Sequence, residues 1–216
     1  MTGTTTPSIG QLVVAAFGFS RNNEPQLNER WIWMSHRIGS KLPRSLLMVS
    51  IQRLGEVDLV CRALEKEMLS QPPRDGEMDL RFNYLVVFSE WWIASAYAIC
   101  FTLKDRQLLS DPEFLRLADD LRMIRVQLEK YEVPSDRHLS EPLQFSPTQL
   151  RPDEKEPPIY VYDKTDRLKA HIPRTGLSAR RSVMWEVSDV KADAARWYER
   201  LELSDRMLTL LSPPKT

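Results

Sequence analysis

The sequence predicts a mainly α-helical protein: a bundle of about six helices around one central apolar helix, with a proline-rich arm and a small β-hairpin before the last helix. Three observations predict this fold. Apolar residues recur at steps of three and four through most of residues 1–134. The stretch 84–103 holds a single charged residue, and seven of the 15 prolines lie between Pro134 and Pro173.

Bulk composition limits the classes of protein that the chain can belong to. Its 216 residues suffice for one sizeable core, and 42% hydrophobic with 28% charged residues is typical of a globular protein. Thirty basic residues balance 30 acidic ones, so nucleic-acid binding would need a local basic patch. Two cysteines, Cys61 and Cys100, support neither a zinc knuckle nor a disulfide framework. With no typical signal peptide, they favour a reducing, cytoplasmic location.

The first three helices are predicted from amphipathic stripes. Residues 8–17 have their apolar side chains on one face, which we expect to be buried: Ile9, Leu12, Val13, Ala16 and Phe17. Pro25 suits the first turn of the second helix, and Gly39 suits its end. The third helix follows Pro43, and its stripe consists of Leu47, Ile51, Leu54, Val57, Cys61, Leu64 and Met68.

The fourth helix, Met78 to Lys104, is apolar almost throughout. A run of this length is also about the length of a membrane span, but Glu90 and several hydroxyl side chains dilute it. We therefore expect a central helix that other helices cover on every side, and no membrane partner. Asp111 and Pro112 then predict the cap and first turn of a fifth helix, which Pro134 ends.

Three regions follow from this pass along the chain. Residues 1–134 form the helical bundle, and 135–188 form the proline-rich arm, with a hairpin at 158–173 that pairs 159–162 with 168–172. Residues 189–212 form a C-terminal helix that packs back on the bundle. Ser188 or Asp189 would cap that helix, with these side chains directed inward: Val190, Ala194, Trp197 and Leu201.

Several catalytic and cofactor motifs are missing from the sequence. It contains no glycine-rich phosphate loop, no G-x-S-x-G and no H-E-x-x-H. The three histidines, His36, His138 and His171, fall on different predicted elements. We therefore expect no metal site and no cofactor, and we assign no enzymatic reaction.

Glu90 and the two tryptophans after it are candidate binding residues. A buried carboxylate in an apolar helix must be paired or neutral, so Glu90 is either a functional group in the core or the partner of Arg30 or Arg125 in a buried ion pair. An exposed position at the edge of the helix is the remaining alternative. Trp91 and Trp92 point about 100° apart and face two neighbours. Core packing is the main expectation for both, and a ligand wall or a dimer surface is the alternative.

Arg30 and His36 form an R-x5-H spacing in the second helix, and Arg125 and Tyr131 form a related spacing in the fifth. Here the chain resembles the HEPN superfamily of small helical domains, many of them ribonucleases with an R-x4–6-H motif. The resemblance implies a homodimer in which Arg30 stabilises phosphate charge and His36 transfers a proton. The two side chains converge only if the helix breaks between them, or if each serves a different half-site. Otherwise His36 is a partly buried residue beside Trp33.

The third candidate site is a basic segment without acidic residues between Arg167 and Trp185. Its basic or potentially basic side chains are Arg167, Lys169, His171, Arg174, Arg180 and Arg181. Such a segment could contact RNA or another anionic partner. It could equally be a solvated loop whose arginines bind the ends of nearby helices.

These observations favour a non-enzymatic, intracellular interaction or regulatory protein, a subunit of a homodimer or of a larger assembly. Its partner would be another protein or a second copy of the chain. One alternative is a HEPN-like ribonuclease, or a degenerate relative, of a toxin or defence system. Another is an accessory protein that binds nucleic acid through the basic segment.

Overall fold

The computed structural model describes residues 6–73, 78–145 and 160–211, and it is mainly helical with two small antiparallel sheets. The helices are α1 (Ile9–Asn23), α2 (Pro25–Gly39), α3 (Leu47–Ser70), α4 (Leu80–Asp105), α5 (Pro112–Lys130), a short 3-10 turn η1 (Asp136–His138) and α6 (Arg200–Leu211). The strands are β1 (Leu143–Phe145), β2 (Tyr160–Tyr162), β3 (Thr175–Leu177), β4 (Val183–Asp189) and β5 (Ala194–Glu199).

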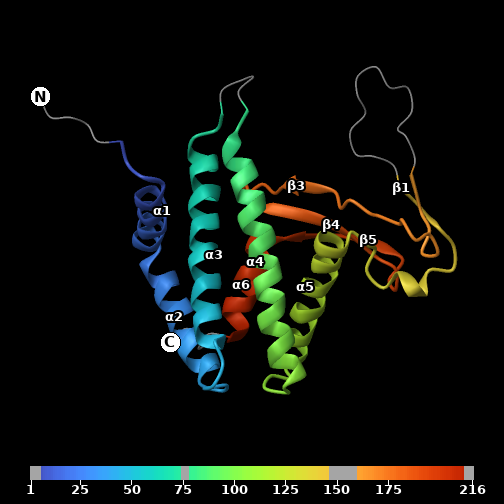
Figure 1. Cartoon of the computed structure of the whole chain (residues 1–216), viewed down its shortest axis with the longest axis horizontal. Helices are drawn as coiled ribbons and strands as arrows, with labels where there is room; N and C mark the ends of the chain where they lie inside the picture. Colours follow the sequence, from blue (N-terminus) through green and yellow to red (C-terminus); the bar gives the residue numbers. More distant parts are fainter. Residues whose placement is uncertain (1–5, 74–77, 146–159, 212–216) are drawn as a thin grey trace, which may run out of the picture.

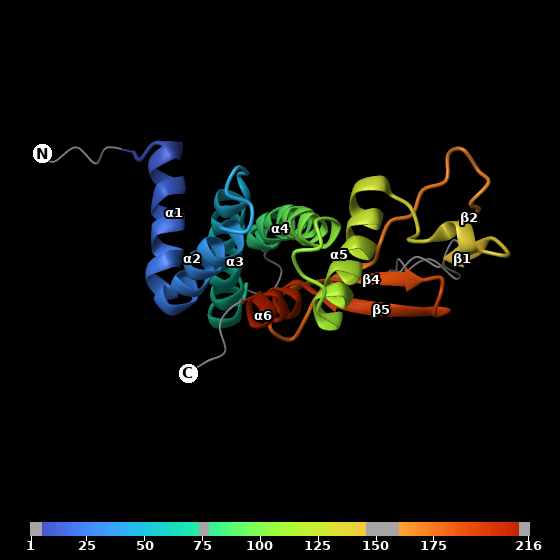
Figure 2. The same cartoon turned by 90° about the horizontal axis from the view of Figure 1, so that it is seen from below.

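In Figure 1, α1 and α2 lie one above the other beside α3, and α4 and α5 follow α3 in chain order. Helix α6 lies behind α3 and α4 in that view, and Figure 2 places it on the opposite side of the bundle from the face seen in Figure 1. The three-stranded sheet, in the order β3-β4-β5, extends beyond α5, and its central strand contacts α4, α5 and α6. The two-stranded sheet β1-β2 lies in the arm at the far end.

Helices α2 and α3 pack closely because of a glycine. A Cβ atom on Gly55 would lie 2.6 Å from the ring of Trp31, so only glycine leaves room for that indole. Trp31 is fully buried at this crossing. The main core then continues through α4, α5, β4 and α6.

A charge network lies inside this core. Arg200, at the start of α6, is fully buried between two acidic residues of α3, Asp58 and Glu65. Its guanidinium donates to Asp58 Oδ1 at 2.5 Å and to both oxygens of Glu65 at 2.8 and 2.9 Å. Its charge also lies 5.9 Å from the ring centre of Trp92 in α4.

The remaining lone pairs of Asp58 are also satisfied. Arg62 donates from Nε to Asp58 Oδ2 at 2.8 Å, and the indole of Trp31 donates to the same oxygen at 3.1 Å. Ser204 donates to Oδ1 at 2.7 Å. Arg200 and the partly buried Arg62 supply positive charge to the two buried carboxylates, so neither carboxylate lacks a cationic partner.

The network keeps Asp58 ionised. Burial by itself raises the pKa of this carboxyl, but Arg200 and Arg62, with hydrogen bonds from Ser204 and Arg62, hold the pKa below its ordinary value of 3.8. Because the pKa is lower in the folded state, this contribution to stability is present above about pH 3.8 and is lost as the pH falls through the lowered pKa.

The first helix differs from its prediction in length and in burial. Helix α1 runs through Gly18 to Asn23, and the capping box of Ser8 and Gln11 starts it. The expected buried face is wrong, because Ile9, Leu12 and Val13 are exposed. Helix α1 contacts mainly α3 and stands at the edge of the bundle, so most of its apolar face has no neighbour among the described residues.

The predicted hairpin is wrong, because its first strand pairs with a different segment of the chain. Strand β2 pairs with β1, with Leu143 opposite Tyr162, and no strand forms at 168–172. The backbone N–H of His171 instead donates to the carbonyl of Tyr131 at 2.7 Å, and Lys169 binds Asp136, so this segment is fixed against the end of α5. The rest of the predicted proline-rich connection, residues 146–159, lies outside the described residues.

The prediction of a last helix from residue 189 is also wrong. Strands β4 and β5 form a hairpin there, and Asp189 makes its turn by accepting from the backbone N–H groups of Lys191 and Ala192. Trp197 is exposed on β5 rather than directed inward. Helix α6 begins only at Arg200, and Leu208 and Leu211 are among its buried residues.

We expect Arg200→Met to lower the free energy of unfolding by roughly 3–5 kcal/mol, because Asp58 and Glu65 would remain buried without their partner. Urea unfolding followed by circular dichroism measures this loss.

The matched control is Arg206→Met in the same helix. Arg206 forms a partly exposed ion pair with Asp120, so its loss should cost less than about 1 kcal/mol. Equal losses in the two variants would mean that the buried network is not what holds α6 in place.

Candidate interaction surface

Helix α4 has one side in the core. Asp79 caps its N-terminus by accepting from the backbone N–H of Arg81. The buried side faces α3, α5 and β4 and consists of Leu85, Ser89, Trp92, Ile93, Ala96, Ile99, Cys100 and Leu103. By length and composition α4 could also cross a membrane, but core helices of soluble proteins share both properties.

The opposite side of α4 is apolar and exposed. Seven residues follow one another there at steps of 4, 3, 4, 3, 4 and 3, and we call them the α4 stripe: Leu80, Tyr84, Val87, Trp91, Ala94, Ala98 and Phe101. Tyr84 is 63% exposed, Val87 61%, Trp91 45% and Phe101 50%. Isolated apolar residues on a surface are ordinary, but a contiguous row of them marks an interaction site.

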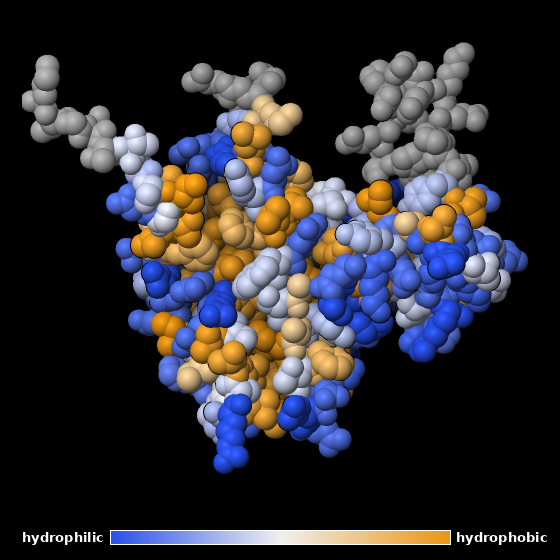
Figure 3. Space-filling model, in the orientation of Figure 1, coloured by the Kyte–Doolittle hydropathy of each residue, from blue (hydrophilic) through white to orange (hydrophobic). Residues whose placement is uncertain are grey.

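The expectation that other helices cover α4 on every side is therefore wrong. Helices α3 and α5 flank it and α6 lies behind it, so no described helix covers the side seen in Figure 1. Figure 3 views the molecule from this side, and apolar groups gather over the helical bundle while the arm beside it is largely hydrophilic.

Trp91 and Trp92 have different environments because adjacent helical residues point about 100° apart. Trp92 is fully buried in the core beside Arg200, which agrees with the main expectation of core packing. Trp91 belongs to the stripe, which agrees with the alternative of a contact surface.

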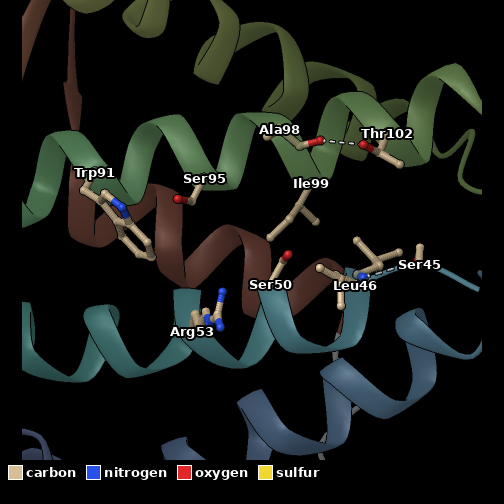
Figure 4. Close-up of a pocket in the computed structure, with 10 residues that line it drawn as sticks. Ser45, Leu46, Ser50, Arg53, Trp91, Ser95, Ala98, Ile99 and Thr102 are labelled. Atoms are coloured by element: carbon tan, nitrogen blue, oxygen red, sulfur yellow. Dashed lines mark hydrogen bonds between the residues drawn. The ribbon is translucent and has the colours of Figure 1, made fainter.

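A groove of about 340 Å³ runs along the stripe between α3 and α4. Trp91, Ala98 and Ile99 form much of its apolar wall on α4, and Leu46 contributes from the α3 side. Figure 4 shows Trp91 and Arg53 at one end of this groove, with Ser45 at the other. The groove widens the apolar surface from the stripe toward α3.

Glu90 lies on the other flank of the stripe and is exposed. Partial burial raises its pKa above 4.5. The predicted ion pair with Arg30 or Arg125 is wrong: Arg125 binds Glu129 in its own helix and lies 4.9 Å above the ring of Tyr97. Within the described ranges, Glu90 forms no ion pair, and the buried carboxylates of this fold are Asp58 and Glu65.

The R-x5-H pair, on which the resemblance to the HEPN superfamily rests, lies on one unbroken helix. Arg30 and His36 both belong to α2, which is continuous from Pro25 to Gly39. A step of six residues therefore separates their directions by roughly 120°. Arg30 is half-buried and His36 is exposed. Within one chain the two side chains diverge, so the HEPN resemblance stays a hypothesis that depends on a second copy for each half-site.

The predicted basic segment is largely neutralised by acidic residues from other parts of the chain. Lys169 forms an ion pair with Asp136, Arg174 with Glu186, and Arg180 with Glu199 and Asp205. Arg167 is exposed, and Arg181 is half-buried beside the start of α4. This pairing lowers the positive potential that contact with RNA would need.

An aromatic cluster around His171 was not identified from the sequence. His171 is buried, its ring centre lies 4.4 Å from that of Phe145, and its Nδ1 lies 2.8 Å from the hydroxyl of Tyr160. Burial lowers its pKa to about 4, so the ring is neutral near pH 7. These residues come from three separate segments, so no sequence spacing indicates the cluster.

Comparisons with known proteins give no relative from which a function could be transferred: the chain matches no family model, no curated protein and no solved structure. Among the described residues, no group of three or more His, Cys, Asp or Glu side chains could hold a metal ion. The α4 stripe is therefore the candidate site that the geometry supports best.

Replacing each of the two adjacent tryptophans in turn should show which of them belongs to the stripe and which to the core. We expect Trp92→Ala to cost roughly 3–5 kcal/mol of unfolding free energy, because it leaves a cavity in the core. Trp91→Ala should cost below about 1 kcal/mol, because its indole is already half in solvent. Urea unfolding at low protein concentration measures both losses, and similar losses would place Trp91 in the core.

Proposed function

We propose that this chain is a non-enzymatic, cytoplasmic interaction protein that works as a subunit of an assembly and uses the α4 stripe as its contact surface. The exposed stripe is the observation that carries this proposal. Its seven residues are contiguous over six helical turns, and the only charge between Leu80 and Phe101 besides Arg81 is Glu90, at the edge. A surface of this kind is costly to leave in water, so a partner that covers it stabilises the protein.

The surroundings of the stripe support a protein partner. Aromatic side chains are enriched in protein interfaces, and the stripe contains Tyr84, Trp91 and Phe101. The groove beside it adds depth, into which a partner side chain can insert. Hydroxyl groups of Ser45, Ser50 and Ser95 line the same groove and offer hydrogen bonds around an apolar centre.

A single introduced cysteine reports whether the stripe is covered. Both natural cysteines, Cys61 and Cys100, are buried, and burial raises the pKa of each thiol to about 12, so neither should react with a maleimide in the folded protein. We expect the thiol of a Val87→Cys variant to react several times more slowly in cells, at natural expression levels, than in dilute purified protein. Quantitative mass spectrometry of the labelled protein measures both rates.

The matched control is Ala179→Cys, an exposed position in the loop between β3 and β4. Its labelling rate should be the same in cells and in dilute solution, relative to a small thiol in each medium. If Val87→Cys shows no more protection than this control, the stripe is not a contact surface, and the proposed function fails.

A further inference from the structure

Building on the proposed function, we propose that the partner on the α4 stripe is a second copy of this chain. The two α4 helices pair parallel about a two-fold axis, and Arg53 of each copy binds Glu90 of the other. The spacing of the stripe residues, the positions of two charged side chains beside the stripe and the length of the stripe each support this arrangement.

The spacing of the stripe is that of a parallel helix pair. Alternating steps of four and three define a heptad pattern, in which apolar residues of one helix fit between those of another. Seven such positions from Leu80 to Phe101 cover roughly 32 Å of helix at 1.5 Å per residue. Three heptads of contact, with the adjoining groove, are within the range of specific protein interfaces.

Two charged side chains without an ion-pair partner among the described residues lie on opposite flanks of the stripe, at nearly the same level along α4. Arg53 of α3 is exposed and lines the groove beside Trp91, so it marks the α3 flank. Glu90 precedes Trp91 by one residue. It lies one heptad before Tyr97, whose ring contacts Arg125 of α5, so Glu90 marks the α5 flank. Neither Arg53 nor Glu90 forms an ion pair with any residue that the structure describes.

The direction of pairing decides which charges meet. A two-fold axis parallel to α4 places the α3 flank of one copy opposite the α5 flank of the other, at the same height. Arg53 then faces Glu90 of the second copy, and the reciprocal pair forms on the other side. An antiparallel pairing, centred between Glu90 and Trp91, brings the two Arg53 side chains together and the two Glu90 side chains together. Like charges repel, so the charge pattern favours the parallel pair.

A charge exchange tests this arrangement. Arg53→Glu and Glu90→Arg, each alone, should weaken the dimer about tenfold in Kd, because each places like charges opposite one another on both sides of the axis. The double variant Arg53→Glu/Glu90→Arg should return to within about threefold of the original Kd, because both pairs form again with exchanged signs. Sedimentation equilibrium over a range of concentrations measures each Kd, at low and at high salt.

Matched variants control for net charge and for folding. Arg196→Glu on β5 and Glu141→Arg in the arm make the same charge changes at exposed positions away from the stripe, and they should leave Kd unchanged. All five altered residues, Val87 included, are exposed, so circular dichroism should show intact helix content in each protein. Val87→Lys, in the centre of the stripe, should abolish the dimer in a folded protein.

Each of the following outcomes would overturn the proposal that a second copy covers the stripe. A double variant that stays as weak as the single variants excludes the Arg53–Glu90 pairing. A purified protein that is monomeric at all concentrations excludes self-association. If that monomer floats with phosphatidylcholine–phosphatidylglycerol vesicles, a lipid surface covers the stripe instead. If Val87→Cys is nevertheless protected in cells and no vesicle binding occurs, a different protein covers the stripe. In that last case the proposed function still holds, while the proposal of a second copy fails.

Discussion

The buried ion network of Arg200 with Asp58 and Glu65 fixes the layout of this molecule. It connects the first residue of α6, 200 residues into the chain, to the middle of α3 in the helical bundle. Charges buried this deeply are tolerated only with complete partners, so α6 and strand β5 before it have one position on the bundle. Because that position is behind α3 and α4, the other side of α4 receives no cover from the C-terminal residues that the structure describes, 160–211.

The fold thereby explains why a single helix is apolar almost all round. One side of α4 fills the core through Trp92 and its neighbours, and the other presents Trp91 and the rest of the stripe to solvent. A helix that is apolar on all sides is usually enclosed by its own chain or by lipid. Here the described part of the chain encloses about half of it, so the remaining half defines a surface for another molecule. Arg53 and Glu90, which form no ion pair with any described residue, favour one direction for a helix that pairs with this surface.

The sequence predicts the parts of this structure that depend on residues close together in the chain. It misses those that depend on residues far apart. Helices α2 to α5 follow from apolar spacing and from caps such as Asp111, which are local signals. Strand β5 falls within the predicted last helix, and β4 falls in the predicted arm outside its hairpin, although Val183, Trp185 and Val187 alternate as in a half-buried strand. Glu90 lies at an exposed edge rather than in the core, its main predicted place, because apolar neighbours in sequence do not reveal which side of a helix is covered. No sequence pattern marks Asp58 and Glu65 as the buried carboxylates, since Arg200 reaches them only in the folded chain.

Disulfide crosslinking tests the central claim, a parallel pair of α4 helices, most directly. In the parallel pair each stripe residue lies opposite its own counterpart, so Val87→Cys alone and Ala94→Cys alone should each give covalent dimers under mild oxidation, while the buried Cys61 and Cys100 stay reduced. In an antiparallel pair centred between Glu90 and Trp91, position 87 lies opposite position 94, so crosslinks would form only when the two variants are mixed. Covalent dimers from each variant by itself are the predicted result. Crosslinks only in the mixture, or none at all, would contradict the account.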